Sequence, residues 1–171
     1  MESISVLTGV RFQPEHFLAH MKKSKKLSYI DFSYVDTLYS PCWVFQLRVA
    51  LPVTKKVKRY AGYYAGFEES TMTPGKLTRL PGSHTVEVDE SRILPTKLTE
   101  EQALAQAWDY NKLWVIRKFK SLNAPPELED HKAECVYKPM YLMRFYNREL
   151  GETKYKVMDS LSGDLEDIEL Q

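Results

Sequence analysis

Two stretches of this chain, 98 positions apart, follow nearly the same pattern. Residues 39–47 read YSPCWVFQL and residues 137–145 read YKPMYLMRF. Strict alternation of large apolar residues with polar ones is typical of a strand with one buried face. Because proline lacks the N–H of a central ladder, Pro41 and Pro139 are expected at a strand start or on an edge. The predicted core faces are Trp43, Phe45, Leu47 and Val49 in the first strand, and Tyr141, Met143 and Phe145 in the second.

The surroundings of this pattern also recur. Each copy is followed by a polar connection and a second strand, which predicts a hairpin, and is preceded by a helix candidate, at 14–26 and at 98–122. A helix, strand, strand order that occurs twice favours duplication of a domain. The expected fold class is therefore α+β, with two tandem repeats, each a helix packed on a small antiparallel sheet. The predicted domains are residues 1–75 for the first repeat, 76–95 for a connector and 96–171 for the second repeat.

The second helix has the clearest boundary signal. Thr99 with Gln102 three residues later forms a capping-box pattern, which satisfies exposed N–H groups at a helix start. At 100° per residue, one stripe is expected to lie on the sheet. Its members are Leu104, Trp108, Val115, Phe119 and Leu122, with Ala107 and Trp114 at its border. Tyr110, Leu113 and Ile116 project away from this stripe, so either the other repeat covers them or they form a patch that binds a partner.

Composition limits the classes of function. The chain is 43% hydrophobic and has a formal net charge of +1, so we expect a folded protein without a global field that attracts nucleic acid or anionic lipid. No apolar run is long enough to span a bilayer. The first ten residues also lack the pattern of a secretory signal. The expected localisation is cytoplasmic.

The chain has few arrangements that suggest catalysis. His16 and His20 share one face of a predicted helix, as two metal ligands would, but no third ligand has a suitable spacing. No Ser or Cys lies in a glycine-flanked nucleophile turn, and the seven glycines form no phosphate-binding loop. We therefore expect a protein that is not an enzyme, with no catalytic residue, no metal ligand and no cofactor.

The closing residues, KYKVMDSLSGDLEDIEL, combine an apolar strand, Asp159, and a turn through Ser162 and Gly163 into an apolar and acidic strand. This pattern resembles the closing strands of PepSY and PepSY-like domains, best over residues 137–169. The resemblance implies a small non-catalytic module that binds or restrains other proteins, sometimes peptidases. The corresponding stretch of the first half lacks the aspartate and departs from the pattern.

Protein binding is the first functional hypothesis, in the sense of an adaptor, an inhibitor or an accessory subunit. In RYAGYYAGF, Gly62 and Gly66 alternate with tyrosines, which leaves open space between the rings for a neighbouring side chain or for a ligand. The expected partner is another protein. The candidate protein-binding residues are Tyr60, Tyr63, Tyr64, Tyr110, Leu113 and Ile116.

Nucleic-acid binding is the alternative hypothesis. Two basic clusters, KKSKK and KKVKR, together with abundant aromatic rings, resemble the composition of surfaces on which bases stack. Lysine is also common at helix ends and hairpin tips for reasons unrelated to binding. The candidate residues are Lys22, Lys23, Lys25, Lys26, Lys55, Lys56, Lys58 and Arg59. Neither hypothesis predicts an oligomeric state.

Overall fold

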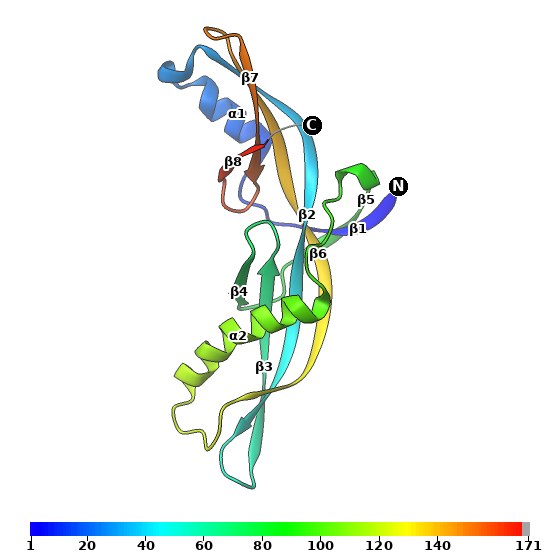
Figure 1. Cartoon of the computed structure of the whole chain (residues 1–171), viewed down its shortest axis with the longest axis vertical. Coiled ribbons are helices and arrows are strands. Elements are labelled where there is room, and N and C mark those ends of the chain that lie inside the picture. Colours follow the sequence, from blue (N-terminus) through cyan, green and yellow to red (C-terminus); the bar gives the residue numbers. More distant parts are fainter. Residues whose placement is uncertain (169–171) are drawn as a thin grey trace. The chain divides into compact units, whose positions relative to one another are not determined.

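The computed structural model describes residues 1–168 (Figure 1). Among the described residues, strands account for 51% and helices for 20%. In chain order the elements are β1 (Glu2–Leu7), α1 (Pro14–Lys22), the 3-10 helix η1 (Lys25–Leu27), β2 (Ile30–Pro52), β3 (Lys58–Glu68), β4 (Thr73–Leu77), β5 (Ser83–Val88), the 3-10 helix η2 (Glu90–Arg92), α2 (Glu100–Lys118), β6 (Glu127–Asn147), β7 (Glu152–Asp159) and β8 (Leu165–Ile168).

All eight strands belong to one mixed sheet. The strand order is β4-β3-β2-β6-β1-β5, while β7 pairs with β6 and β8 pairs with β7. The two predicted hairpins are present: β2 pairs with β3 in a register that sets Trp43 opposite Phe67, and β6 pairs with β7 with Tyr141 opposite Met158. The parallel contact between β1 and β6, at Val6 and Tyr137, makes the sheet mixed.

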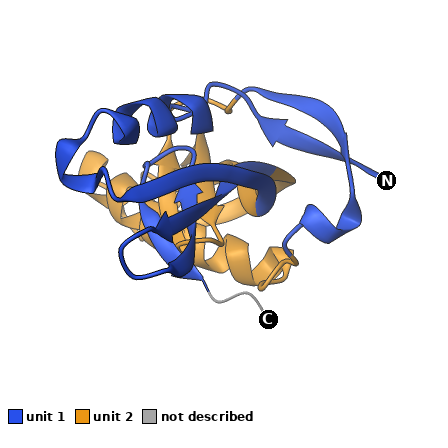
Figure 2. Ribbon diagram, turned by 90° about the horizontal axis from the view of Figure 1, so that it is seen from above, with its two compact units in different colours: residues 1–40, 82–94, 137–171 blue, residues 41–81, 95–136 orange. Residues whose placement is uncertain are grey.

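The predicted fold class, α+β with two tandem helix-on-sheet repeats, is wrong. The chain forms two compact units that each draw on both halves of the sequence (Figure 2): unit 1 contains residues 1–40, 82–94 and 137–171, and unit 2 contains residues 41–81 and 95–136. The element order does recur, but α2 packs on the β2–β3 hairpin from the other half of the sequence. Alternation identifies the buried face of a strand, but it does not specify which distant segment covers that face.

The two prolines of the repeated pattern lie inside the long strands β2 and β6. The sequence predicts a strand start or an edge for them, and the strand start is wrong. The hairpin ladder begins one residue after each of them, at Cys42 in β2 and at Met140 in β6. Pro41 and Pro139 therefore lie just before their hairpin ladders, where the N–H that proline lacks is not required for pairing. Residues 76–95, predicted as a connector, contain the end of β4 and all of β5 and η2.

The core of unit 2 lies between α2 and the β2–β3 hairpin. Phe45, Leu47 and Val49 are buried there, so the predicted inward face of β2 is confirmed for these residues. The centre of the buried stripe of α2 consists of residues spaced four apart, whereas the predicted Leu104, Trp108 and Phe119 flank it and are half-buried. The central residues are Ala103, Ala107, Asn111 and Val115. Two alanines at the centre let the helix backbone approach the sheet closely.

The start of α2 is fixed from two sides. The predicted capping box is confirmed: the backbone N–H of Gln102 donates to Thr99 Oγ1 at 3.2 Å, and the Thr99 N–H donates to Gln102 Oε1 at 3.0 Å. The buried carboxylate of Glu69, just after β3, also accepts the backbone N–H of Leu98 at 2.8 Å. A negative group beside a helix N-terminus is favourable, so these contacts position α2 on its hairpin.

The core of unit 1 uses both faces of β6. Tyr141 and Met143 pack with Phe17 and Leu18 of α1, while on the reverse face Leu142 is also buried. The sequence predicts only one buried face for this strand. Neither helix in residues 1–168 has both the length and the apolar composition needed to cross a membrane.

Candidate functional site

A groove of about 610 Å³ lies in unit 2 between the C-terminal half of α2 and strands β3 and β4. We call it the α2–β4 groove. Its aromatic lining is Tyr63, Tyr64 and Trp114, and its basic lining is Lys76, Arg117 and Lys118. In Figure 1, α2 lies beside β3 and β4, which explains how residues far apart in the sequence line one groove.

The strand β3 supplies the two tyrosines from opposite faces. Successive side chains of a strand point to opposite sides, so Tyr63 shares the α2-facing side with Ala65, whereas Tyr64 points to the other side, opposite Leu77 of β4 in register. A Cβ at Gly62 would meet no atom within 4 Å, so the surface over this glycine is open. A Cβ at Gly66 would meet Leu77 at 3.5 Å, so that space is occupied.

Asn111 holds the helix against the edge strand of the groove. Its side-chain amide is buried and donates to the carbonyl oxygen of Gly75 in β4 at 3.1 Å and to that of Ala107 at 2.7 Å. A buried amide that satisfies two carbonyls stabilises the contact between α2 and β4. Asn111 was not among the residues predicted from the sequence. Its signal is the spacing of four residues from both Ala107 and Val115, which puts a polar side chain on the buried stripe.

The basic side chains of the groove have no acidic neighbours. Lys76 Nζ lies 5.0 Å from the centroid of the Trp114 ring, and Arg117 Cζ lies 5.7 Å from it. No Asp or Glu is part of the lining, and in the described part of the chain no carboxylate lies within 4.0 Å of Lys76, Arg117 or Lys118. Two other cations of unit 2 do form ion pairs, Arg48 with Glu129 and Lys58 with Glu127.

The whole of unit 2 has a positive balance, with 13 Lys and Arg against 9 Asp and Glu. At the groove, burial raises the pKa of the Tyr63 hydroxyl above its ordinary value. This phenol therefore stays protonated at neutral pH and adds no negative charge. The groove combines aromatic walls with a positive potential, which suits a ligand that is both apolar and acidic.

The outer face of α2 borders the groove and exposes large apolar side chains. The exposed fractions are 38% for Tyr110, 55% for Leu113, 42% for Trp114 and 42% for Ile116. Ile116 also lines a second hollow of about 470 Å³, formed with Phe119, Leu122 and the loop 123–126.

All six predicted protein-binding residues lie in unit 2. Tyr63 and Tyr64 line the groove, and Tyr110, Leu113 and Ile116 lie on the outer face of the helix. Tyr60 shares with Tyr64 the side of β3 away from α2 but does not line the groove, and Arg48 stacks 4.6 Å from its ring centroid. Four groove residues were not assigned to a site from the sequence: Lys76, Trp114, Arg117 and Lys118.

The predicted nucleic-acid-binding residues are divided between the two units. Lys22, Lys23, Lys25 and Lys26 lie at the end of α1 and in η1, within unit 1, and all are exposed. The other four lie in unit 2, at the turn between β2 and β3 and at the start of β3. They are Lys55, Lys56, Lys58 and Arg59, also exposed. Arg59 lines a further hollow of about 240 Å³ that includes Lys118 and Lys120.

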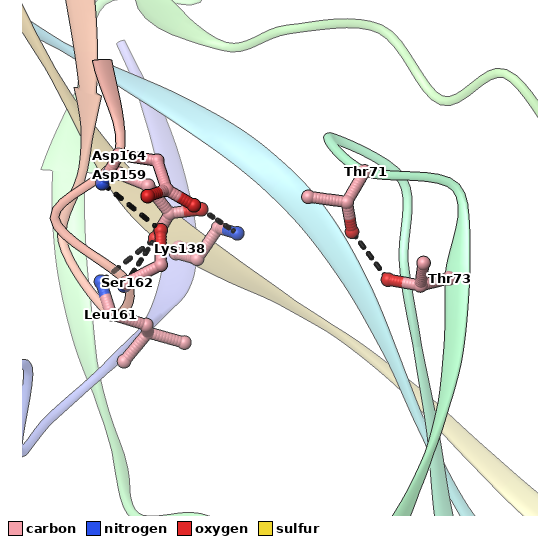
Figure 3. A network of polar contacts seen from close by, with 7 residues as sticks. All are labelled: Thr71, Thr73, Lys138, Asp159, Leu161, Ser162 and Asp164. Atoms are coloured by element: carbon pink, nitrogen blue, oxygen red, sulfur yellow. Dashed lines mark hydrogen bonds and ion pairs between the residues drawn. The ribbon is translucent and has the colours of Figure 1, made fainter.

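Unit 1 contains a buried ion pair, shown in Figure 3. Lys138 Nζ lies 2.6 Å from Asp159 Oδ2, with 0% and 8% of the two side chains exposed. Asp159 Oδ1 also accepts the backbone N–H groups of Leu161 at 2.8 Å and Ser162 at 3.2 Å. Burial alone would raise the pKa of Asp159, but the hydrogen bonds from Lys138 and Leu161 outweigh it and lower that pKa below its ordinary value.

This ion pair has a structural explanation. It connects the middle of β6 to the turn that follows β7, and the φ of +75° at Gly163 completes that turn. The PepSY resemblance rests on these residues. It extends over residues 137–169, and residue 169 lies outside the described residues. The hydroxyl pair of Thr71 and Thr73, also in Figure 3, belongs to the β3–β4 turn of unit 2.

Metal ligands do not gather anywhere in residues 1–168: no three His, Cys, Asp or Glu side chains are placed to hold an ion. His16 and His20 are both exposed on α1. No family model matches the chain, and no curated protein or solved structure matches it either. The α2–β4 groove and the helix face beside it are therefore the candidate functional site.

Proposed function

We propose that this chain is a non-catalytic protein-binding module, acting as an adaptor, an inhibitor or an accessory subunit. It binds its protein partner through the outer face of α2 and the adjoining α2–β4 groove. The observation that supports this most is the exposure of Leu113, Trp114 and Ile116 on a helix whose buried face is complete without them. Localisation in the cytoplasm stays a prediction from the sequence.

The two faces of α2 differ in how much they contribute to the core. Its inner face packs through Ala103, Ala107 and Val115, so the larger residues on the outside contribute little to the core. Complete burial of a large apolar side chain provides about 1.5–3 kcal/mol, and Leu113, Trp114 and Ile116 still expose 42–55% of their surface, so only part of that free energy has been gained. A partner that covers this face recovers part of that free energy. Aromatic residues and arginine, both present here, are also the residue types that contribute most at protein interfaces.

The titratable groups are consistent with a role in binding. Lys138 and Asp159 form a buried ion pair with each other, and Asp159 also accepts a backbone N–H group. Both side chains therefore have a structural role. The predicted surface residues Tyr63, Leu113 and Ile116 supply contact area and no acid or base that works near neutral pH.

An affinity capture from cell extract tests this proposal with matched variants. Leu113→Glu places a charge in the centre of the proposed surface, and glutamate is a good helix former, so α2 should remain folded. Val57→Glu is the control, because Val57 is 51% exposed in the β2–β3 turn of the same unit. We expect one protein to be retained by the wild type and by Val57→Glu at low and high salt, and to be lost with Leu113→Glu. Equal retention by all three chains would refute the proposed surface.

Nucleic-acid binding is the second candidate, and the acid-free, aromatic lining of the groove favours it. Single strands bind to surfaces that combine stacked aromatic rings with a positive charge. The same capture distinguishes it: nucleic acid retained through phosphate contacts is sensitive to nuclease and is lost steeply as salt rises. This alternative is supported if the wild type retains nucleic acid in place of a protein, and if Lys76→Gln abolishes that retention.

A further inference from the structure

We propose that the α2–β4 groove receives an acidic segment of the protein partner, with Asp or Glu side chains facing Lys76, Arg117 and Lys118 and an apolar side chain lying on Trp114. This inference rests on the proposed function and specifies the chemistry of the partner. It makes the groove a charge-selective pocket beside the apolar face of α2.

The three cations of the groove are available to a ligand. Arg117 and Lys118 occupy the last turn of α2, where positive charge also stabilises the negative end of the helix dipole. That reason does not apply to Lys76, which lies on β4 and has no carboxylate within 4.0 Å in the described part of the chain. Lys76 is exposed on the edge strand β4, so its charge is available to a ligand that enters the groove.

The indole ring of Trp114 lies beside two of these cations. Lys76 and Arg117 come from different elements, and both lie within 6 Å of the Trp114 ring centroid. Trp114 is 42% exposed, so a ligand can reach it. A segment with an apolar residue next to a carboxylate can contact the ring and at least one cation together.

The size and surroundings of the groove suit a peptide segment. A volume of about 610 Å³ is in the range of pockets that hold ligands far larger than one carboxylate, roughly 300–1,000 Å³. Leu113 and Ile116 lie outside the groove lining but are exposed on the same helix as the groove residue Trp114. Those apolar side chains favour a peptide over a nucleic acid, because a sugar-phosphate backbone gains little from contact with leucine and isoleucine.

The test uses the full chain and three defined probes. The first is an acidic peptide, Glu-Glu-Leu-Glu-Phe-Glu-Leu-Glu, the second is the same peptide with Gln in place of every Glu, and the third is an oligonucleotide of eight thymidines. Binding is measured by calorimetry at low and at moderate salt, for the wild type and for Lys76→Gln, Arg117→Gln and Lys118→Gln. Lys132→Gln is the matched control, since Lys132 is an exposed lysine of β6 in the same unit and lies outside the groove and both sets of candidate residues.

We expect the acidic peptide to bind to the wild type and to Lys132→Gln with equal affinity, and to bind about threefold to fivefold more weakly for each groove cation removed. The Gln peptide should bind much more weakly. The inference is overturned if the acidic peptide does not bind, if Lys76→Gln behaves as Lys132→Gln does, or if only the oligonucleotide binds.

The same variants separate this inference from the proposed function. If the captured protein is lost with Leu113→Glu but retained in full by the three groove variants, the helix face binds the partner and the acidic-segment inference fails. If the captured protein is retained by Leu113→Glu, the proposed function fails, whatever the peptides show.

Discussion

Replacing Asp159 with asparagine removes the carboxylate that faces a fully buried lysine in unit 1. Lys138 Nζ lies 2.6 Å from Asp159 Oδ2, and neither side chain is accessible enough for water to substitute. Removing one partner of a buried ion pair costs about 3–5 kcal/mol, because the remaining charge stays desolvated. The equilibrium constant for unfolding should therefore rise roughly 100- to 4,000-fold.

The matched control is Asp167→Asn in the same unit. Asp167 pairs with Lys156 at 3.3 Å, but its side chain is 77% exposed, so this substitution should cost less than about 1 kcal/mol. Urea denaturation followed by circular dichroism measures both free energies of unfolding. Hydrogen exchange in peptides from residues 137–159 shows whether the loss lies in unit 1. A cost for Asp159→Asn no greater than that for Asp167→Asn would refute the reasoning.

The pH dependence of stability provides a second readout of this pair. Because the pKa of Asp159 is lowered in the folded protein, its contribution is complete above the pKa of an unfolded aspartate. The contribution is lost as the pH falls from that value through the lower folded pKa. We expect the wild type to lose more free energy of unfolding over this acidic window than Asp159→Asn does. Equal losses would show that the carboxylate is not stabilised in its charged form.

Three further substitutions test local features by urea denaturation. Gly163→Ala should cost about 1–2 kcal/mol, because Gly163 has a φ of +75° and a new Cβ would lie 3.0 Å from the Phe12 ring. Gly62→Ala is the control and should change the free energy of unfolding by no more than about 0.5 kcal/mol. Equal effects of the two substitutions would contradict backbone strain at Gly163. Thr99→Ala should cost about 1 kcal/mol through loss of the capping box, and no loss would mean that the helix start is held elsewhere. Asn111→Ala should cost about 1–3 kcal/mol by depriving two carbonyls of a donor, and a neutral effect would mean that water replaces it.

Local features of this chain can be predicted from its sequence. The capping box at Thr99, the buried face of β2 from Phe45 to Val49 and the hairpins all depend on residues close together in the chain. Short-range spacing contains this information, since a helix start needs a side chain three residues from its target. The exposure of Leu113 and Ile116 follows from helical periodicity in the same way.

The pairing of distant segments could not be predicted in the same way. The alternation in residues 39–47 fits a strand in a small repeat as well as the middle of the 23-residue strand β2. Nothing in the spacing shows that α2 covers the β2–β3 hairpin from the other half of the chain. The groove was missed for the same reason: the bond from Asn111 to Gly75 joins residues 36 positions apart, and Lys76 lies in a stretch predicted to be a connector.

The resemblance to PepSY domains stays a prediction. Its residues have a local physical reason in this structure, because Asp159 accepts two backbone N–H groups of the turn and Gly163 adopts a positive φ. A turn with these requirements selects an aspartate and a glycine at this spacing whatever the ancestry of the chain. The motif by itself therefore does not argue for a particular partner.

Photo-crosslinking tests most directly whether the outer face of α2 is the surface that meets the partner. Benzoylphenylalanine placed at Leu113 reacts with any chain that lies against it, and the same group at Val57 controls for chance encounters from an equally exposed position. The account predicts one discrete protein adduct at Leu113 and none at Val57, formed also at high salt. Adducts that are the same at both positions, or that form only at Val57, would contradict it.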